Sequence, residues 1–149
     1  MTANVEIRAV GADERAAWEP LWQGYLMFYK AKLAPEVSDV AWARFHDPAE
    51  PMFLLGAYVD GALTGIVQFL YHRSTWTPGD YCYLQDLFVA DTARGLGLGR
   101  KLIEAVYVAA KAAGCSRVHW LTQNDNAQAR LLYDRIADDS GFMQYRKVF

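Results

Sequence analysis

The stretch RGLGLGRK, residues 94–101, carries the sharpest chemical signal in the chain. Its glycines permit positive φ angles and let a ligand approach the backbone closely. The first amides of the helix expected to begin here have no intrahelical acceptor, so they form an anion site. Arg94, Arg100 and Lys101 add positive charge around it. A diphosphate fits this geometry, although a plain tight turn is the alternative explanation for any glycine-rich stretch.

The residues around this loop argue against two other phosphate-binding motifs. A Walker P-loop needs a lysine followed by Ser or Thr for magnesium, whereas Lys101 precedes Leu102. A Rossmann fold places its loop after the first strand of a doubly wound sheet. Here four expected strands come first and too little chain follows, so dinucleotide binding is poorly supported.

Hydrophobic periodicity on both sides of the loop predicts a mixed α+β fold in one domain, residues 1–149. The sheet should be mostly antiparallel and flanked by helices, with one parallel strand-helix-strand unit. We expect that unit to consist of a strand at 81–89, a helix at 97–113 and a strand at 117–122. The other expected elements are strands at 5–9, 53–59, 62–72 and 142–149, a helix reaching about residue 33, a helix after Pro35, a hairpin turn at Asp60-Gly61 and a helix from Asn126.

Composition excludes several classes of protein. The 149 residues are 53% hydrophobic and carry a formal charge of −2, with no basic patch for nucleic acid. No leader pattern or membrane-spanning run is present, so we expect a cytoplasmic protein. Cys82 and Cys115 are too few for a disulfide scaffold, and the three histidines show no metal-like or triad spacing, so no metal site is expected.

Four motifs in the right order make the chain resemble the GNAT family of N-acetyltransferases. Its phosphate-loop pattern fits Arg94, Gly97 and Gly99, and its fourth strand resembles LQDLFV at 84–89. Its Asn, Ala and Leu-Tyr pattern fits Asn126, Ala129, Leu132 and Tyr133, and a Gly-Phe follows at 141–142. The resemblance implies the GNAT fold and direct transfer of acetyl from acetyl-CoA to a primary amine. One departure is the spacing from Tyr133 to Gly141, where residues 134–140 should lengthen the helix or add a loop.

The resemblance also implies which residues hold acetyl-CoA. The pantetheine arm would pair with the strand at 81–89, and amides near Phe88 and Val89 would face the developing charge on the carbonyl oxygen. Asn126 would contact the coenzyme arm or fix the turn, and its alternative role is a helix N-cap. The implied coenzyme-binding residues are Leu87, Phe88, Val89, Arg94, Gly95, Leu96, Gly97, Leu98, Gly99, Arg100, Asn126 and Tyr133.

Two residues are candidates for the acid–base chemistry. The resemblance implies that the Tyr133 hydroxyl faces the coenzyme sulfur and protonates the departing thiolate, whereas a lone tyrosine on an apolar helix face is otherwise a core residue. Asp86 is the nearest carboxylate on the central strand and a candidate base, acting directly or through water. The alternative is a structural strand-end carboxylate that accepts backbone hydrogen bonds. Related enzymes often carry an acidic pair on this strand, and here its first position is Gln85.

The acceptor is expected to be a small amine, an amino acid or a lysine-like group, with protein lysine open. Tyr25 and Tyr29 are the preferred pocket residues, with Gln85 and Asp86, because a phenol combines packing with a polar contact. The neighbouring aromatic side chains are expected to be core: Trp18, Trp22, Phe28 and Trp42. Alternatives are a non-catalytic acetyl-CoA sensor or interaction module, which Gln85 favours, and a structural domain with a glycine-rich turn. A homodimer is plausible for this fold.

Overall fold

A five-stranded sheet forms the centre of the computed structural model, which describes residues 2–93 and 95–149. The elements follow in the order β1 (Val5–Ala9), α1 (Arg15–Phe28), α2 (Pro35–Phe45), β2 (Met52–Val59), β3 (Ala62–Arg73), β4 (Asp80–Val89), a 3₁₀ turn (Asp91–Ala93), α3 (Leu98–Ala112), β5 (Val118–His119) and α4 (Ala127–Ile136). The strands lie side by side in chain order, and only β4 and β5 are parallel. The expected mixed sheet with one parallel unit is confirmed.

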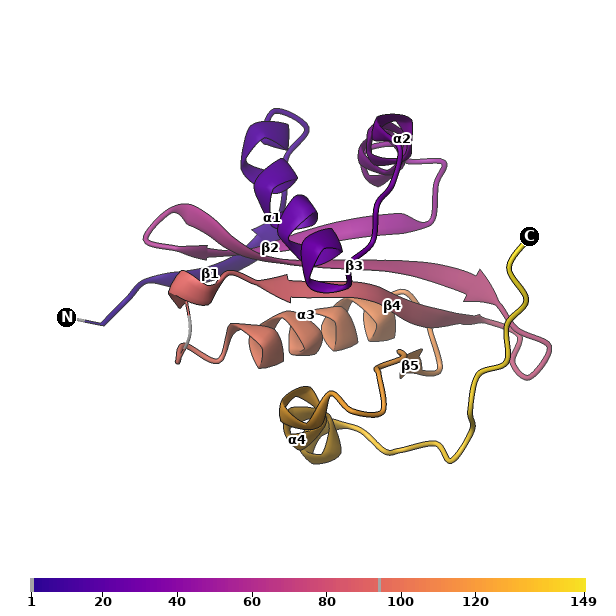
Figure 1. Ribbon diagram of the computed structural model, residues 1–149. Helices are drawn as coiled ribbons and strands as arrows, with labels where there is room; N and C mark the ends of the chain where they lie inside the picture. The colour runs from indigo at the N-terminus through magenta and orange to yellow at the C-terminus, as the bar shows by residue number, and fades with distance from the viewer. Residues whose placement is uncertain (1, 94) are drawn as a thin grey trace.

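Helices cover both faces of this sheet, with α1 and α2 on one side and α3 and α4 on the other (Figure 1). Successive residues of β3 serve opposite faces, as a strand requires: Ile66 packs with the α1 cluster and Val67 with the α3 cluster. Trp18 is 0% exposed in the α1 cluster, so its truncation to Ala would cost about 3–5 kcal/mol. Among the described residues, no helix has the length and apolarity to cross a bilayer.

The turn between β2 and β3 follows directly from its two residues. Asp60 and Gly61 have φ angles of 49° and 84°, and Val59 pairs with Ala62 across the turn. Positive φ at both central positions is the type I′ geometry, whose twist matches that of the flanking strands. The predicted hairpin is confirmed.

Helix α1 ends at Phe28, five residues earlier than the expected end near residue 33. Lys30 adopts a φ of 54°, and the amide of Ala31 donates to the carbonyl of Leu26 at 2.8 Å. This is a Schellman-type ending, which usually places glycine at the left-handed position. Because lysine stands there instead, the sequence offered no stop signal.

Strand β4 diverges from β5 soon after the two meet. They pair only at Cys82 with Val118 and at Tyr83 with His119, so the strand expected at 117–122 is much shorter. Farther along β4, a register shift opposite Gln68 and Phe69 leaves Gln85 without a partner. Such a bulge changes the direction of the following side chains. Residues 84–89 therefore have β3 on one side and no strand on the other within the described chain.

The strand expected at 142–149 is absent from the structure, and that expectation was wrong. Residues 137–149 form neither helix nor strand, and α4 ends at Ile136. Residues 134–136 therefore complete α4, and residues 137–140 form a loop beyond it. A strand needs a neighbouring edge for its hydrogen bonds, and the two-residue β5 offers little edge. Several apolar side chains of this segment are exposed: Phe142, Met143, Tyr145, Val148 and Phe149.

Candidate active site

Asp86 lies on β4, just past the bulge, and is only 8% exposed. Its Oδ2 accepts a hydrogen bond from Nε2 of Gln68 at 2.7 Å, and the Tyr25 hydroxyl donates another. Burial raises the pKa of the Asp86 carboxyl, and the two hydrogen bonds oppose that rise by lowering it. A carboxylate with a raised pKa is a better proton acceptor than an ordinary aspartate.

A second layer holds Gln68 in place behind Asp86. The indole Nε1 of Trp18 donates to Oε1 of Gln68 at 2.8 Å, so the amide must turn its Nε2 toward the carboxylate. Gln68 is itself 3% exposed. The sequence analysis missed this residue. The available signal was a polar residue inside the otherwise apolar run of β3.

The end of α1 brings two tyrosines to the same carboxylate. An added Cβ at Gly24 would lie 2.9 Å from the Phe88 ring, so glycine lets the helix approach β4 closely. The rings of Tyr25 and Tyr29 are 4.9 Å apart. Burial raises the pKa of both phenols, and the negative charge of Asp86 raises it further. Both hydroxyls therefore stay protonated at neutral pH and can donate hydrogen bonds.

Tyr133 reaches this region from α4, on the opposite face of the sheet. Its ring lies edge-on to Trp120 at 5.4 Å, and burial raises its pKa, with a smaller contribution from Tyr29. Tyr29 in turn interacts with Asp86. Because β4 and β5 diverge here, groups from the two faces come within electrostatic range. The structure thus brings Tyr25 and Tyr29 to Asp86 and places Tyr133 within electrostatic range of Tyr29, and the sequence analysis had selected all four residues.

The loop before α3 has the geometry of an anion cradle. Gly95 and Gly97 have φ angles of 84° and 68°, and a Cβ added to either would meet nothing within 4 Å. Gly97 occupies the N-cap position without any side-chain capping bond. The amide of Lys101 donates to the Gly97 carbonyl at 3.1 Å, so the amides at 98–100 have no acceptor within the helix. Arg94 lies outside the described residues.

Three of the predicted site residues have other surroundings than expected: Arg100, Asn126 and Gln85. Arg100 pairs with Glu104 at 2.6 Å on the exposed surface of α3, a pair that a bound anion can displace. Asn126 stands at the N-cap position of α4, but its amide donates to Thr122 at 3.5 Å instead of capping the helix. Gln85 is exposed at the bulge and bonds to no described side chain. Its exposure leaves Asp86 as the buried polar group of this segment.

Other ionisable groups lie away from this cluster. Asp39 pairs with Arg15 on the exposed surface, and the two ring nitrogens of His46 lie 3.0 Å and 2.9 Å from the carbonyl oxygens of Trp42 and Val10. Within the described parts of the chain, no group of three His, Cys, Asp or Glu side chains could hold a metal ion.

Comparison with known proteins identifies the family of this chain. Residues 12–137 match the Acetyltransferase (GNAT) family, and the chain belongs to that family. It is 34% identical over 146 residues to the D-amino-acid N-acetyltransferase of Saccharomyces cerevisiae, covering 97% of this chain and 91% of that protein. It is also 33% identical over 87 residues to the thialysine N-epsilon-acetyltransferase of Mus musculus, covering 55% of this chain and 49% of the relative.

A solved structure shows the same fold. The ribosomal-protein-alanine N-acetyltransferase of Brucella melitensis biovar Abortus superposes with a TM-score of 0.82 at 23% identity, covering 98% of this chain and all of that one. Identity at that level supports the fold and leaves the acceptor undetermined. The chain is therefore an acetyltransferase of the GNAT family, whose members use acetyl-CoA as co-substrate.

Proposed function

We propose that this enzyme acetylates the primary amine of a small amine or amino acid, with Asp86 as proton acceptor and Tyr133 as proton donor. The observation that carries the proposal is the cluster at the divergence of β4 and β5, where Tyr29 interacts with both Asp86 and Tyr133. An acetyl transfer needs a base on the amine side and an acid on the thiol side. The cluster offers one candidate for each.

The residues around the splayed strands fit acetyl-CoA. The open glycine loop and the free amides at 98–100 suit the diphosphate, and Gly97 meets no neighbour that a ligand would have to displace. The unpaired side of β4 at 84–89 leaves backbone groups for the pantetheine arm, and the amides near Phe88 and Val89 can stabilise negative charge. When bound, acetyl-CoA supplies a thioester carbonyl for the amine to attack.

The side chains then divide the proton transfers. Asp86 takes the proton of the acceptor ammonium, directly or through one water, because its raised pKa brings it closer to that of the amine. Tyr25 and Gln68 hold the carboxylate in position throughout. Tyr133 keeps its proton at neutral pH because burial raises its pKa, and it gives that proton to the departing sulfur. The second proton that the nitrogen loses as the amide forms restores the Tyr133 hydroxyl. No protein nucleophile is needed, and Cys82 is unsuited to the role because burial raises its pKa to about 12.

The relatives support an amino-acid acceptor. One is named for acetylating D-amino acids and the other for acetylating the ε-amine of thialysine. The direct test is a screen of amines and amino acids in which release of coenzyme A is measured and each product is identified by mass spectrometry. We expect at least one amine or amino acid to yield an N-acetyl product. Tight coenzyme binding with no product across the panel would instead favour a non-catalytic sensor.

A further inference from the structure

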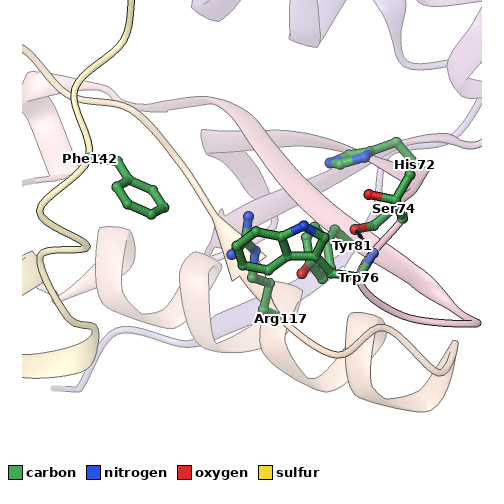
Figure 2. A pocket seen from close by; sticks show the side chains of 7 residues that line it. His72, Ser74, Trp76, Tyr81, Arg117 and Phe142 are labelled. Atoms are coloured by element: carbon green, nitrogen blue, oxygen red, sulfur yellow. Dashed lines mark hydrogen bonds between the residues drawn. The ribbon is translucent and has the colours of Figure 1, made fainter.

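An open pocket lies near the start of β4, apart from the acid–base cluster. Its volume is about 360 Å³, and it is lined by His72, Ser74, Thr75, Trp76, Tyr81, Arg117 and Phe142. Figure 2 shows the Arg117 guanidinium beside Trp76, with Phe142 across from it. None of the four clustered side chains at the β4 and β5 divergence lines this pocket, so its own chemistry needs an explanation.

Arg117 is the positively charged side chain of the pocket lining, and it is held in place. Its carbonyl accepts the Cys82 amide at 2.9 Å, which anchors the backbone beside β4. Its guanidinium carbon lies 3.9 Å from the centre of the Tyr81 ring. This stacking covers one face and leaves the N–H edge free for a planar anion. Among the described residues, no carboxylate pairs with Arg117, and the nearby Asp80 faces Arg73 at 3.6 Å.

The lining adds a neutral hydrogen-bond donor, while Arg117 supplies its positive charge. Ser74 accepts the Trp76 amide at 3.1 Å through its oxygen, so its O–H remains free to donate. His72, which also lines the pocket, has its Nε2 3.0 Å from Nε2 of His119. Burial lowers the pKa of His119, and Arg117 and His72 lower it further, so its imidazole is neutral at pH 7. Arg117 and Ser74 both line the pocket, and each can donate a hydrogen bond to a carboxylate.

A continuous aromatic strip connects this pocket to Asp86. Tyr83 interacts with Asp86 and stacks on His119, with the two ring centres 5.1 Å apart. The His119 ring meets the Tyr81 ring edge-on, with ring centres 6.2 Å apart, and the Arg117 guanidinium stacks on the Tyr81 ring. Tyr81 and Tyr83 share a face of β4 because alternate residues point the same way, and the bulge brings Asp86 onto that face.

The length of this strip discriminates between acceptors. Tyr81 pairs with His72 and Asp86 with Gln68, so the bulge leaves four steps of β3 between them and their Cα atoms lie about 13 Å apart along the strand. Because Arg117 stacks on the Tyr81 ring and the side chains of Tyr81 and Asp86 share one face, hydrogen bonds of about 3 Å at each end leave roughly 7 Å between an amine at Asp86 and a carboxylate at Arg117. An α-amino acid acetylated on its α-amine cannot span that gap, because one carbon separates its two groups. An amino acid with an amine at the end of a long side chain can span it.

We propose that Arg117 and Ser74 form a carboxylate subsite that makes this enzyme prefer lysine-like amino acids, acetylated on the side-chain amine. The proposal rests on the function proposed above and adds the acceptor class. Arg117 acts as a specificity residue and takes no part in proton transfer.

The test compares three acceptors that differ in one feature each: lysine, cadaverine, which lacks the carboxylate, and norleucine, which lacks the side-chain amine. The wild-type enzyme should use lysine best and form the ε-acetyl product, identified by fragmentation. In Arg117→Gln, kcat/KM for lysine should fall about tenfold or more, mostly through KM, because a charged hydrogen-bonded contact is lost. Cadaverine should change little. Arg44→Gln removes an equal charge from exposed α2 and should affect neither acceptor.

Two further measurements separate the possible failures. Arg117→Lys keeps the charge and should recover part of the preference for lysine, and circular dichroism checks that each variant folds. Calorimetry measures lysine binding without turnover. Arg117-dependent lysine binding with no acetylation of any amine would overturn the proposed function and retain the subsite. Equal losses for lysine and cadaverine, a preference for norleucine, or lysine binding unaffected by Arg117→Gln would overturn the subsite.

Discussion

At the scale of single residues, Asp86 is subject to two opposing effects. Burial disfavours its charged form, while hydrogen bonds from Tyr25 and Gln68 favour it. The net rise in pKa means that the carboxylate becomes available as a base only as pH rises through a value above that of an ordinary aspartate. The acidic limb of the pH–activity profile should therefore shift when a hydrogen-bond partner of Asp86 is replaced.

Replacing Tyr25 by Phe should move this acidic limb to higher pH. The change removes the first of the two bonds that lower the pKa of Asp86, so that pKa rises further. A hydrogen bond to a charged group contributes about 1.5 kcal/mol, which corresponds to a shift of about one pH unit. The measurement is the pH profile of kcat/KM with one fixed acceptor, so that the acceptor's own ionisation is common to both enzymes.

Tyr29→Phe is the matched control. Tyr29 feels the negative charge of Asp86, whereas Tyr25 also donates a hydrogen bond to that carboxylate. Its acidic limb should move less than that of Tyr25→Phe. Equal profiles for the wild type and Tyr25→Phe would show that Asp86 does not govern the limb.

Replacing Tyr133 by Phe should lower kcat by about 10²–10⁴-fold, the usual contribution of a positioned general acid. Binding of coenzyme A, measured by calorimetry, should stay close to that of the wild type because the ring is kept. Tyr107→Phe is the control, since that hydroxyl donates to the Ile136 carbonyl at 2.9 Å and holds the end of α4. It should cost about 1 kcal/mol of stability with little loss of turnover. Unchanged kcat in Tyr133→Phe would exclude its role as acid.

At the scale of elements, the start of α3 joins backbone conformation to binding. Gly97 needs a left-handed φ to turn the chain into the helix, and the same turn directs free amides outward. The sequence analysis identified this element because glycine conformation and unpaired helix amides are local properties. It could not foresee that β5 pairs over two residues, because strand length depends on the neighbouring edge.

Gly97→Ala should raise the KM for acetyl-CoA several-fold and cost about 1–2 kcal/mol of stability, since an L-residue is strained at positive φ. Gly61→Ala is a matched control, because Gly61 also has positive φ and open space but lies in the β2–β3 turn. It should lose similar stability with its KM unchanged. The two effects are measured by thermal unfolding and by acetyl-CoA titration of initial rates. Equal KM values in the two variants would contradict the cradle.

At the scale of the whole molecule, the two faces of one sheet contribute residues to two separate apolar clusters. Residues such as Ile66 and Val67 are neighbours on β3 yet belong to opposite clusters, so loss of the sheet removes both. The domain predicted from residues 1–149 should therefore unfold as one cooperative unit.

Unfolding followed by far-UV circular dichroism and by tryptophan fluorescence should give the same midpoint. The fluorescence reports mainly on the α1 side, where Trp18 and Trp22 are buried, whereas the dichroism reports on all helices and strands. Midpoints separated by more than the experimental error would show that the two sides unfold independently.

The sequence by itself determined the local features of this protein: the type I′ turn at Asp60-Gly61, the glycine loop before α3, most helices and strands, and the identity of Asp86, Tyr25, Tyr29 and Tyr133 as candidates. Backbone conformation, helix amides and residue spacing are properties of short segments, so they can be predicted without the fold. The end of α1 escaped prediction because lysine stands at a position that usually carries glycine.

Only the tertiary structure decided what surrounds those residues. The bond from Trp18 to Gln68 joins residues 50 positions apart, and the bond from Gln68 to Asp86 spans 18. The seating of Arg117 on Tyr81 likewise requires β4 and β5 to meet. The pKa of a carboxyl depends on all the groups that replace water around it. Such surroundings exist only once distant segments pack together, and for that reason the sequence named the candidates while the fold set their chemistry.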